Sequence, residues 1–455
     1  MTGPVARVVA CAVGMAALAG GLASAGLGRG PGLAVRPASA LPAHGEWPAG
    51  QAAAGGRAGL AGRAVRALPL RAGVSRLAGW QKGGLLGVSF ARAADGWAVG
   101  VACVPDCNSG REDTLIVHWN GSRWSRQASP DLSPLEGLFS VSAVSAADAW
   151  AAGGYGTGSG AFRTLMLRWN GVAWSRVTSP DPSPDREYGL NVISAVTATS
   201  ARNAWAVGYY CARRCQADGE VDRTLILHWN GVRWAVAASP DPGTGYSVLT
   251  GVTAVSATSA WAVGSYAAGT SVMRPLALHW NGIRWARAAI AQPRRGGRYR
   301  LLTGVTATSA NSAWAAGYSC TANCSTQPDA SQADRTLILH WNGTRWSPAP
   351  TPDPGARYDI LNAISAASAG SGWAVGDFAT STGKIAPLVL RWNGHAWAHS
   401  PAPRSRADAS LFAASASPNP PVWAVGYTCA AGSSCLAEFL HPLTLRWNGR
   451  SWTSP

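Results

Sequence analysis

The stretch RTLILHWNGTRW at residues 335–346 is nearly identical to RTLILHWNGVRW at residues 223–234. Its first half is rich in apolar β-formers and ends in a Trp. The Asn-Gly that follows is the strongest short signal for a tight hairpin turn. The stretch therefore predicts two antiparallel strands joined at Asn-Gly, with a Trp on each side of the turn. Its recurrence indicates an internal repeat.

The hairpin pattern occurs seven times after residue 83, and a second Trp always follows the WNG Trp by five residues. Each copy has a WAVG-like segment upstream, and a large apolar residue lies 12 positions before the Trp of that segment. We therefore predict four short strands per copy, the last of which ends in an SPDP-like stretch where proline stops strand pairing. The repeat tryptophans, three per copy, are Trp97, Trp119, Trp124, Trp150, Trp169, Trp174, Trp205, Trp229, Trp234, Trp261, Trp280, Trp285, Trp314, Trp341, Trp346, Trp373, Trp392, Trp397, Trp423, Trp447 and Trp452.

A single four-stranded sheet cannot bury both of its faces, but copies stacked around an axis cover one another. Seven copies, a common closure number for such rings, favour a closed ring over an open solenoid. We predict an all-β fold, a seven-bladed β-propeller of four-stranded antiparallel blades, over residues 84–455. The predicted repeats span about residues 84–130, 137–180, 190–240, 248–290, 301–352, 360–401 and 410–455.

The N-terminal region differs in composition from the repeats. Arg7, the apolar stretch VVACAVGMAALAGGLA and the small residues Ala23–Ala25 are typical of a secretory signal peptide, which we place at residues 1–25. Residues 26–83 are rich in Ala, Gly, Pro and Arg without periodicity and predict a disordered linker. We expect a secreted, extracellular protein with no transmembrane segment after signal removal. A retained N-terminal anchor is the alternative.

The net charge of +16 is divided between two regions. Residues 1–83 hold eight Arg, Lys82 and the single acid Glu46, a net charge of +8, and the other +8 is spread over the repeats. The one dense basic run, RRGGRYR at residues 294–300, has no second strip that continues it. We interpret the charge as a basic tail and a solvated surface, and we do not expect nucleic-acid binding.

Eight cysteines lie outside the signal peptide, in four local pairs. An even number in an exported chain favours disulfides. Zinc is the alternative for the CxxxC spacing, but no His lies beside the pairs in a consistent register. The predicted disulfide pairs are Cys103 with Cys107, Cys211 with Cys215, Cys320 with Cys324, and Cys429 with Cys435.

The WAVG strand, the aromatic residue after it, and the hairpin with a ring residue on each side of a short turn resemble the kelch and galactose-oxidase-like propeller repeats. The AWAVG…LxxWNGxxW pattern is similar to a repeat of exported actinobacterial proteins. The resemblance covers roughly residues 84–455 and implies the propeller fold. It leaves function open, because such propellers include oxidases, lyases and binding scaffolds. The Tyr/Cys/His metal site of the copper oxidases has no candidate in this sequence.

Two kinds of connection are expected on opposite faces of the propeller. The spacings around the first-to-second turn and the WNG hairpin are constant, whereas the distance from the WAVG Trp to the WNG Trp varies from 19 to 27 residues. Loops that vary on a rigid scaffold are where binding usually occurs, and Tyr suits stacking on sugars or on a partner. The alternative is that the tyrosines only cap the blade ends. The predicted ligand-binding residues, all near the variable loops, are Tyr188, Tyr246, Tyr299, Tyr358, Arg298 and Arg300.

A basic residue precedes every WNG Trp, which could indicate an anion or metal site. Equivalent positions in different blades are far apart, so we interpret these residues as packed against neighbouring Trp rings. The seven residues are His118, Arg168, His228, His279, His340, Arg391 and Arg446.

Motifs for catalysis are missing from the sequence. It contains no GxSxG, no phosphate loop and no HExxH. The recurring acids of the SPDP-like stretches have the pattern of turn residues, whereas a glycosidase needs two convergent carboxylates. We predict a monomeric binding or interaction module without metal or cofactor, which takes a carbohydrate or a protein surface on the variable face. An extracellular carbohydrate-active lyase or hydrolase with its site in the central funnel is the alternative.

Overall fold

The computed structural model describes residues 82–104, 110–215, 220–269, 272–291, 299–320, 334–356, 358–403, 405, 407–416, 421–429 and 441–455. These residues form strands and connecting loops, and none of them belongs to a helix of the length and hydropathy that crossing a bilayer requires. The predicted signal peptide and almost all of the predicted linker lie outside the described residues.

The described residues form 28 strands, which fall into seven consecutive groups of four that we call units 1 to 7. The strands of units 1 to 3 are β1 (Gly83–Arg92), β2 (Asp95–Cys103), β3 (Glu112–Trp119), β4 (Trp124–Gln127), β5 (Glu136–Ser145), β6 (Asp148–Gly156), β7 (Phe162–Trp169), β8 (Trp174–Arg176), β9 (Asn191–Ser200), β10 (Asn203–Arg213), β11 (Val221–Trp229) and β12 (Trp234–Val236). Those of units 4 and 5 are β13 (Ser247–Ser256), β14 (Ser259–Ala267), β15 (Met273–Trp280), β16 (Trp285–Arg287), β17 (Tyr299–Ser309), β18 (Ser312–Cys320), β19 (Arg335–Trp341) and β20 (Trp346–Ala349). Those of units 6 and 7 are β21 (Asp359–Ser368), β22 (Ser371–Ala379), β23 (Ile385–Trp392), β24 (Trp397–His399), β25 (Ala409–Ser415), β26 (Val422–Thr428), β27 (His441–Trp447) and β28 (Trp452–Thr453).

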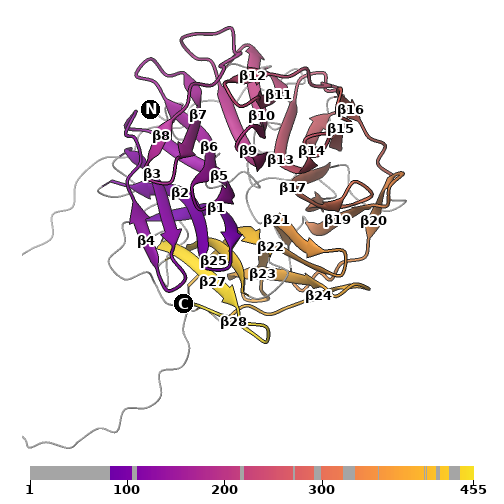
Figure 1. The fold of residues 1–455 in the computed structure, drawn as a ribbon. Coiled ribbons are helices and arrows are strands. Elements are labelled where there is room, and N and C mark those ends of the chain that lie inside the picture. Colours follow the sequence, from indigo (N-terminus) through magenta and orange to yellow (C-terminus); the bar gives the residue numbers. More distant parts are fainter. Residues whose placement is uncertain are drawn as a thin grey trace, which may run out of the picture. The chain divides into compact units, whose positions relative to one another are not determined.

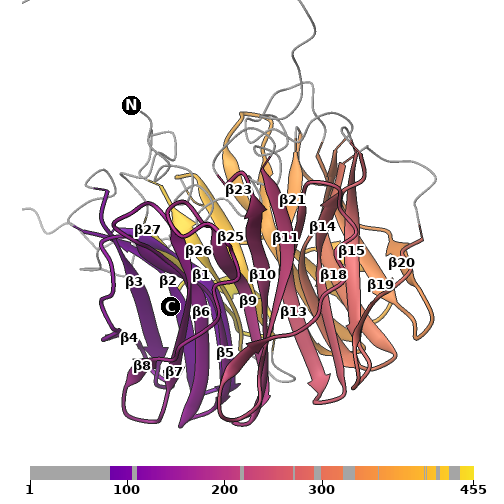
Figure 2. The same ribbon diagram turned by 90° about the horizontal axis from the view of Figure 1, so that it is seen from above.

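Within each unit the strands pair antiparallel in chain order, as predicted. In the described part of the chain five units are separate four-stranded sheets. Units 4 and 5 are joined into one eight-stranded sheet through a single parallel pair, Met273 with Tyr299. The first strands β1, β5, β9, β13, β17, β21 and β25 each contact the next, and β25 contacts β1. Figure 1 shows these strands around the centre of the ring, and Figure 2 shows them side by side.

The predicted hairpin forms in every unit, but its turn is longer than a two-residue Asn-Gly turn. In unit 3, Trp229 pairs with Trp234, which leaves four residues in the loop. The Asn230 side chain accepts hydrogen bonds from the backbone N–H of Val232 and of Arg233, both at 3.0 Å. Gly231 follows with a φ of 94°, a conformation that favours glycine. The turn thus uses Asn because its side chain caps the loop, and Gly because the next position has a left-handed backbone conformation.

Tryptophans join each unit to the next. The WAVG Trp of unit 3, Trp205, lies 4.8 Å from Trp280 and 5.1 Å from Trp285 of unit 4, the second contact being edge-to-face at 89°. The contact that joins unit 7 to unit 1 has the same form, with Trp423 at 4.7 Å from Trp119 and 5.2 Å from Trp124. The other WAVG tryptophans contact the next unit in the same way, namely Trp97 with Trp169 and Trp174, Trp150 with Trp229 and Trp234, Trp261 with Trp341 and Trp346, Trp314 with Trp392 and Trp397, and Trp373 with Trp447 and Trp452.

The basic residue before each of the seven WNG tryptophans packs on the WAVG Trp of its own unit, which confirms the packing interpretation. His228 stacks on Trp205 with ring centroids 4.1 Å apart. Arg168 lies 5.1 Å above the ring of Trp150. The same arrangement holds for His118, His279, His340, Arg391 and Arg446. None of these seven residues approaches a shared centre, since each lies in a different unit.

One predicted disulfide is described completely. Cys211 and Cys215 are bonded, with their Cα atoms 5.7 Å apart, so this pair is not a zinc site. Cys103, Cys320 and Cys429 are also disulfide-bonded. Their predicted partners Cys107, Cys324 and Cys435 lie outside the described residues.

We expect Trp205→Ala and Trp423→Ala to destabilise the protein by similar amounts, about 3–5 kcal/mol each, because each leaves a cavity between two units. Urea denaturation followed by circular dichroism measures both values. Val236→Ala is the control, because Val236 is 54% exposed, and it should change the free energy of unfolding by less than about 0.5 kcal/mol. A loss below about 1 kcal/mol for Trp423→Ala alone would show that stability does not depend on the contact between units 7 and 1.

Candidate functional site

Every first strand has a β-bulge at the same place. In β13 the pairing to β14 passes from Leu249 directly to Gly251, so Thr250 is left outside the ladder. The same shift occurs in the other six first strands. A bulge frees one residue from pairing and redirects its side chain. The seven bulge residues are Leu86, Phe139, Ser194, Thr250, Thr303, Asn362 and Phe412.

The bulge residues and the two residues that follow each of them line one central cavity of about 230 Å³. All seven first strands contribute equally to its wall. The described residues that line it include no acid, no basic residue and no Tyr. The cavity is therefore electrically neutral, and its chemistry is set by the bulge side chains and by exposed backbone.

The bulge residues divide the wall into two halves. Three neighbouring units, 7, 1 and 2, supply the large apolar side chains Phe412, Leu86 and Phe139. The four remaining units supply the polar side chains Ser194, Thr250, Thr303 and Asn362. An apolar wall facing a wall of hydroxyl and amide groups is typical of a site for an amphipathic ligand.

Most of the polar bulge side chains are tied to the next unit. Thr250 Oγ1 donates to the Leu302 carbonyl and Thr303 Oγ1 to the Leu361 carbonyl, both at 2.7 Å. Asn362 Nδ2 donates to the next equivalent carbonyl, that of Leu411, at 2.9 Å.

Two polar atoms of the wall have no such partner. Ser194 Oγ and Asn362 Oδ1 are buried and have no hydrogen-bond partner in the described part of the chain. The Ser194 residue as a whole is 5% exposed. Buried polar atoms are nearly always paired in native proteins, so unpaired ones call for an explanation. Both residues line the cavity, and the two atoms are themselves buried.

A buried acid lies behind Asn362, one residue pair nearer to the variable face. Asp377 is 7% exposed and pairs with Ile360 in the ladder. Its Oδ1 accepts hydrogen bonds from Ser410 Oγ at 2.6 Å and from Asn362 Nδ2 at 3.2 Å. Tyr358 also bonds to this carboxyl. We call Asp377, Tyr358, Asn362 and Ser410 the Asp377 cluster.

Burial dominates the electrostatics of this cluster. Burial raises the pKa of Asp377 to about 6, against the hydrogen bonds from Ser410, Tyr358 and Asn362, which lower it. The pKa of Tyr358 is raised by burial and then by the nearby Asp377 charge. Tyr427 has a raised pKa for the same two reasons and stacks on the cavity residue Phe412 at 5.5 Å. Both tyrosines stay protonated at neutral pH, and Tyr358 donates a hydrogen bond to Asp377.

The predicted ligand-binding residues have different environments. Tyr188 is 42% exposed, whereas Tyr299 is 7% exposed and belongs to an apolar cluster against which Tyr246 packs. Tyr358 is the one that reaches the Asp377 cluster. Arg300 is partly buried, and burial and the nearby Arg274 lower its pKa. Arg298 lies outside the described residues. Among the described residues, Tyr246 and Tyr299 lie together in one cluster, and Tyr358 lies in the Asp377 cluster.

Sequence reasoning missed Asp377, Ser410 and the bulge residues. The sequence did contain one signal for Asp377. It directly follows the WAVG-like Gly of unit 6, and none of the other six units has an acid at that position. The equivalent residues are Val101, Gly154, Tyr209, Ser265, Tyr318 and Tyr427.

A cluster of one cysteine and two acids in unit 3 has the spacing of a metal site but cannot bind a metal through the cysteine. Ligand atoms of Cys211, Glu220 and Asp222 lie within 4.8 Å of one another. The Cys211 sulfur is bonded to Cys215, so no thiolate is present to bind a metal.

Acids of the SPDP-like stretches bind the third strands of their own units. Asp181 Oδ1 accepts from the backbone N–H of Thr164 at 2.8 Å, and Asp353 Oδ1 accepts from that of Thr336 at the same distance. They cap the third strands of their own units and do not face the cavity.

We expect the protein to be most stable at mildly acidic pH. Burial raises the pKa of Asp377, Asp334 and Asp359 to about 6 and that of Glu112 and Glu136 to about 7. Because the unfolded-state values are about 4, the folded state binds more protons between pH 4 and 7. The free energy of unfolding should be greatest below about pH 4.5 and should fall as pH rises through 6 to 7.

Urea denaturation at pH 4.5 and 7.5 measures this difference. Asp377→Asn should reduce it by up to about 2–3 kcal/mol, since two pKa units are removed from the balance. Equal stability at both pH values would contradict the raised pKa values.

No protein-family model and no curated protein matches the chain. Solved structures with a similar fold include a polysaccharide lyase, the PL25 ulvan lyase, with 8% identity and a TM-score of 0.52 over 83% of this chain and 97% of that chain. The WD40 β-propeller domain of Doa1 has 9% identity and a TM-score of 0.45 over 84% and 99%. YCF48 bound to a D1 peptide has 13% identity and the same TM-score over 84% and 99%. At such low identity the likeness shows the β-propeller fold alone.

Proposed function

We propose that this chain is a binding module that takes a carbohydrate in the central cavity and on the loop-variable face around it. The observation that carries the proposal is the neutral, two-sided cavity wall with two unpaired buried acceptors, Ser194 Oγ and Asn362 Oδ1. A sugar presents an apolar C–H face and a rim of hydroxyl donors. Phe412, Leu86 and Phe139 would pack on the former, and the polar half of the wall would bond the latter.

The volume of the cavity limits what it can hold. At about 230 Å³ it is smaller than the roughly 300–1,000 Å³ of pockets for drug-sized ligands. A single sugar residue, or one end of a longer chain, is the matching size. The rest of a longer ligand would extend over the variable face, where Tyr188, Tyr246, Tyr299, Tyr358, Arg298 and Arg300 remain the proposed contacts. The alternative ligand is a protein surface, which would place a side chain of similar size in the cavity.

A carbohydrate-active enzyme is the second candidate, and the Asp377–Tyr358 pair is the observation that favours it. A lyase needs a base and a proton donor close to the substrate. However, Asp377 is 7% exposed and separated from the cavity by Asn362, and the raised pKa of Tyr358 keeps its hydroxyl protonated at neutral pH, so that it does not serve as the base. A hydrolase needs two carboxylates across the scissile bond, and the described residues that line the cavity include no acid. We therefore favour binding over catalysis.

We also propose, from the sequence patterns alone, that the chain is exported by its N-terminal segment and that its repeats are kelch-like. The paired cysteines support the first point, because disulfides persist in oxidising compartments.

Glycan-array binding by the full chain tests the proposal, followed by calorimetric titration with the strongest glycan. Ser194→Ala should weaken binding by about three- to tenfold, because it removes one hydrogen bond to the ligand. Ser194 Oγ bonds no described residue, so the fold should keep its stability.

Ser265→Ala is the matched control. Ser265 Oγ is also buried without a partner among the described residues, but Ser265 does not line the cavity. This variant should bind like the parent. Absence of glycan binding, or equal binding by parent and Ser194→Ala, would contradict the proposal. Glycan cleavage that Asp377→Asn abolishes would establish the enzyme instead.

A further inference from the structure

The face opposite the variable loops has its own pattern of side chains. The first-to-second turn and the WNG hairpin of each unit lie together there, as the hydrogen bond from Trp169 Nε1 to the Ala146 carbonyl at 2.9 Å shows. The same bond links Trp280 to Ala257 at 3.0 Å in unit 4. We call this end of the units the WNG face.

Three neighbouring units present apolar tips on the WNG face. The residue after the WNG Gly is Val172 in unit 2, Val232 in unit 3 and Ile283 in unit 4, with exposed fractions of 84%, 82% and 83%. They are the most exposed large apolar side chains of the described chain. The equivalent residues of units 1, 5, 6 and 7 are polar, namely Ser122, Thr344, His395 and Arg450.

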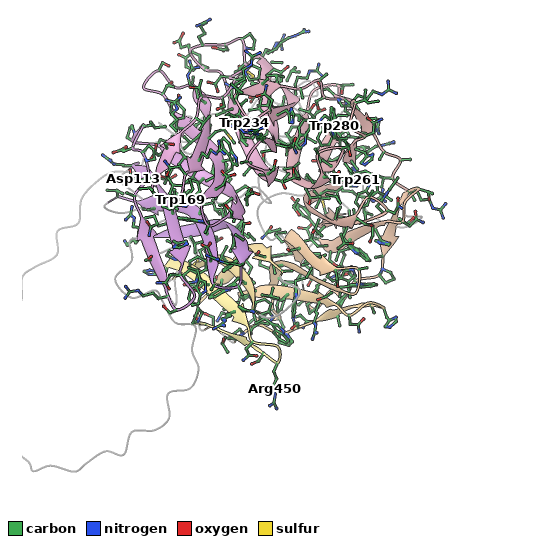
Figure 3. The ribbon with its side chains drawn as sticks, viewed as in Figure 1. Asp113, Trp169, Trp234, Trp261, Trp280 and Arg450 are labelled. Carbon is green, nitrogen blue, oxygen red and sulfur yellow. A yellow bond between two sulfur atoms is a disulfide. The ribbon has the colours of Figure 1, made fainter. Side chains whose placement is uncertain are left out.

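The exposed charge around these tips is positive. Arg233 and Arg284 directly follow two of them, and Arg202 lies against Gly231 of the unit 3 hairpin. Figure 3 shows Arg450 extending away from the fold in unit 7. The exposed arginines of this face are Arg92, Arg123, Arg202, Arg233, Arg284, Arg345 and Arg450.

The acids of the WNG face do not balance this charge. Within the described residues the two acids on its turns, Asp95 and Asp148, are buried. Asp95 pairs with His118 at 2.7 Å and with Arg92 at 3.7 Å, and Asp148 pairs with Arg168 at 2.9 Å. Among the described residues, Arg92 is thus the one exposed arginine of this face with an acid partner. The surface that a partner would meet is therefore cationic.

We propose that the WNG face docks on an anionic lipid bilayer, with the tips of units 2 to 4 inserted at the level of the headgroups. Arginines near an anionic surface are attracted to it, and exposed aliphatic side chains enter the boundary between headgroups and acyl chains. The half-buried rings of Trp169 and Trp280 lie in the hairpins of units 2 and 4, and Trp favours this interface. A soluble polyanion would bind the arginines but would leave the apolar tips in water.

This surface is separate from the proposed ligand site. Its tips belong to the third-to-fourth hairpins, whereas the predicted ligand contacts belong to the loops at the other ends of the strands. Docking through the WNG face would leave the variable face directed away from the bilayer. Carbohydrate binding and membrane binding can therefore succeed or fail independently.

Co-sedimentation of the full chain with vesicles tests the proposal, using phosphatidylcholine alone and phosphatidylcholine with 30% phosphatidylglycerol. The parent should bind only the anionic vesicles. The triple variant V172S/V232S/I283T keeps the net charge, so a loss of about tenfold or more would report lost insertion. The triple variant R202Q/R233Q/R284Q should lose about fivefold per Arg and have a weaker salt dependence.

Two single variants are matched controls and should bind like the parent. Val236→Ser replaces an exposed Val outside the tips, and Arg274→Gln replaces an exposed Arg at the variable end of β15. Residues 1–83 carry a net charge of +8 in every variant, so the difference between variants is the readout. Unchanged binding by V172S/V232S/I283T would overturn the proposal. So would equal affinity for soluble polyphosphate and vesicles with no effect of the tip variant, which would identify a polyanion surface.

Discussion

The structure depends on the contact between one WAVG Trp and the two hairpin tryptophans of the next unit. The basic residue before the WNG Trp covers part of the WAVG Trp within the same unit, and the two hairpin tryptophans of the next unit cover another part. Each unit therefore completes the burial of its aromatic surface only when a neighbour is present. Each aromatic pair adds about 0.5–1.5 kcal/mol beyond the burial of area. Since Trp423 of unit 7 contacts Trp119 and Trp124 of unit 1, the ring of contacts is complete within the described residues, whose units each consist of four consecutive strands.

The repeated contacts leave a few positions free to differ between units. The bulge residue is one of them, because it lies outside the ladder and faces the cavity. The residue after the WAVG Gly is another, where Asp377 replaces the Val, Gly, Ser or Tyr of other units. The hairpin residue after the WNG Gly is the third. The seven units are otherwise nearly uniform. Differences at these three positions make the cavity wall two-sided, place a buried acid in unit 6 and give the WNG face its apolar tips in units 2 to 4.

The fold could be predicted because the tryptophans that pack between units recur at a constant spacing within each hairpin. A WNG Trp always lies five residues before the next Trp, since the two pair across one hairpin. The packing of His228 and similar residues on Trp rings also followed from their place in the repeat. The turn was less predictable, because capping by Asn230 allows a longer loop than Asn-Gly alone suggests.

The candidate site could not be predicted in the same way. Asn362, Asp377 and Ser410 come from three strands of two units and are distant in the sequence. A bulge does not interrupt the apolar pattern that identifies a strand, so the cavity residues look like ordinary strand residues. The burial of Tyr299 likewise depends on packing that the spacing of the repeat does not reveal.

The head-to-tail form of the Trp contact has a consequence for assembly. Each unit has one donor surface and one acceptor surface that do not complement themselves, as in a heterologous interface. A chain that lacks its last unit would therefore expose an uncovered Trp at one end and an unoccupied Trp pair at the other. These two ends complement each other, so copies of such a fragment would associate head to tail, whereas the whole chain satisfies both ends within itself.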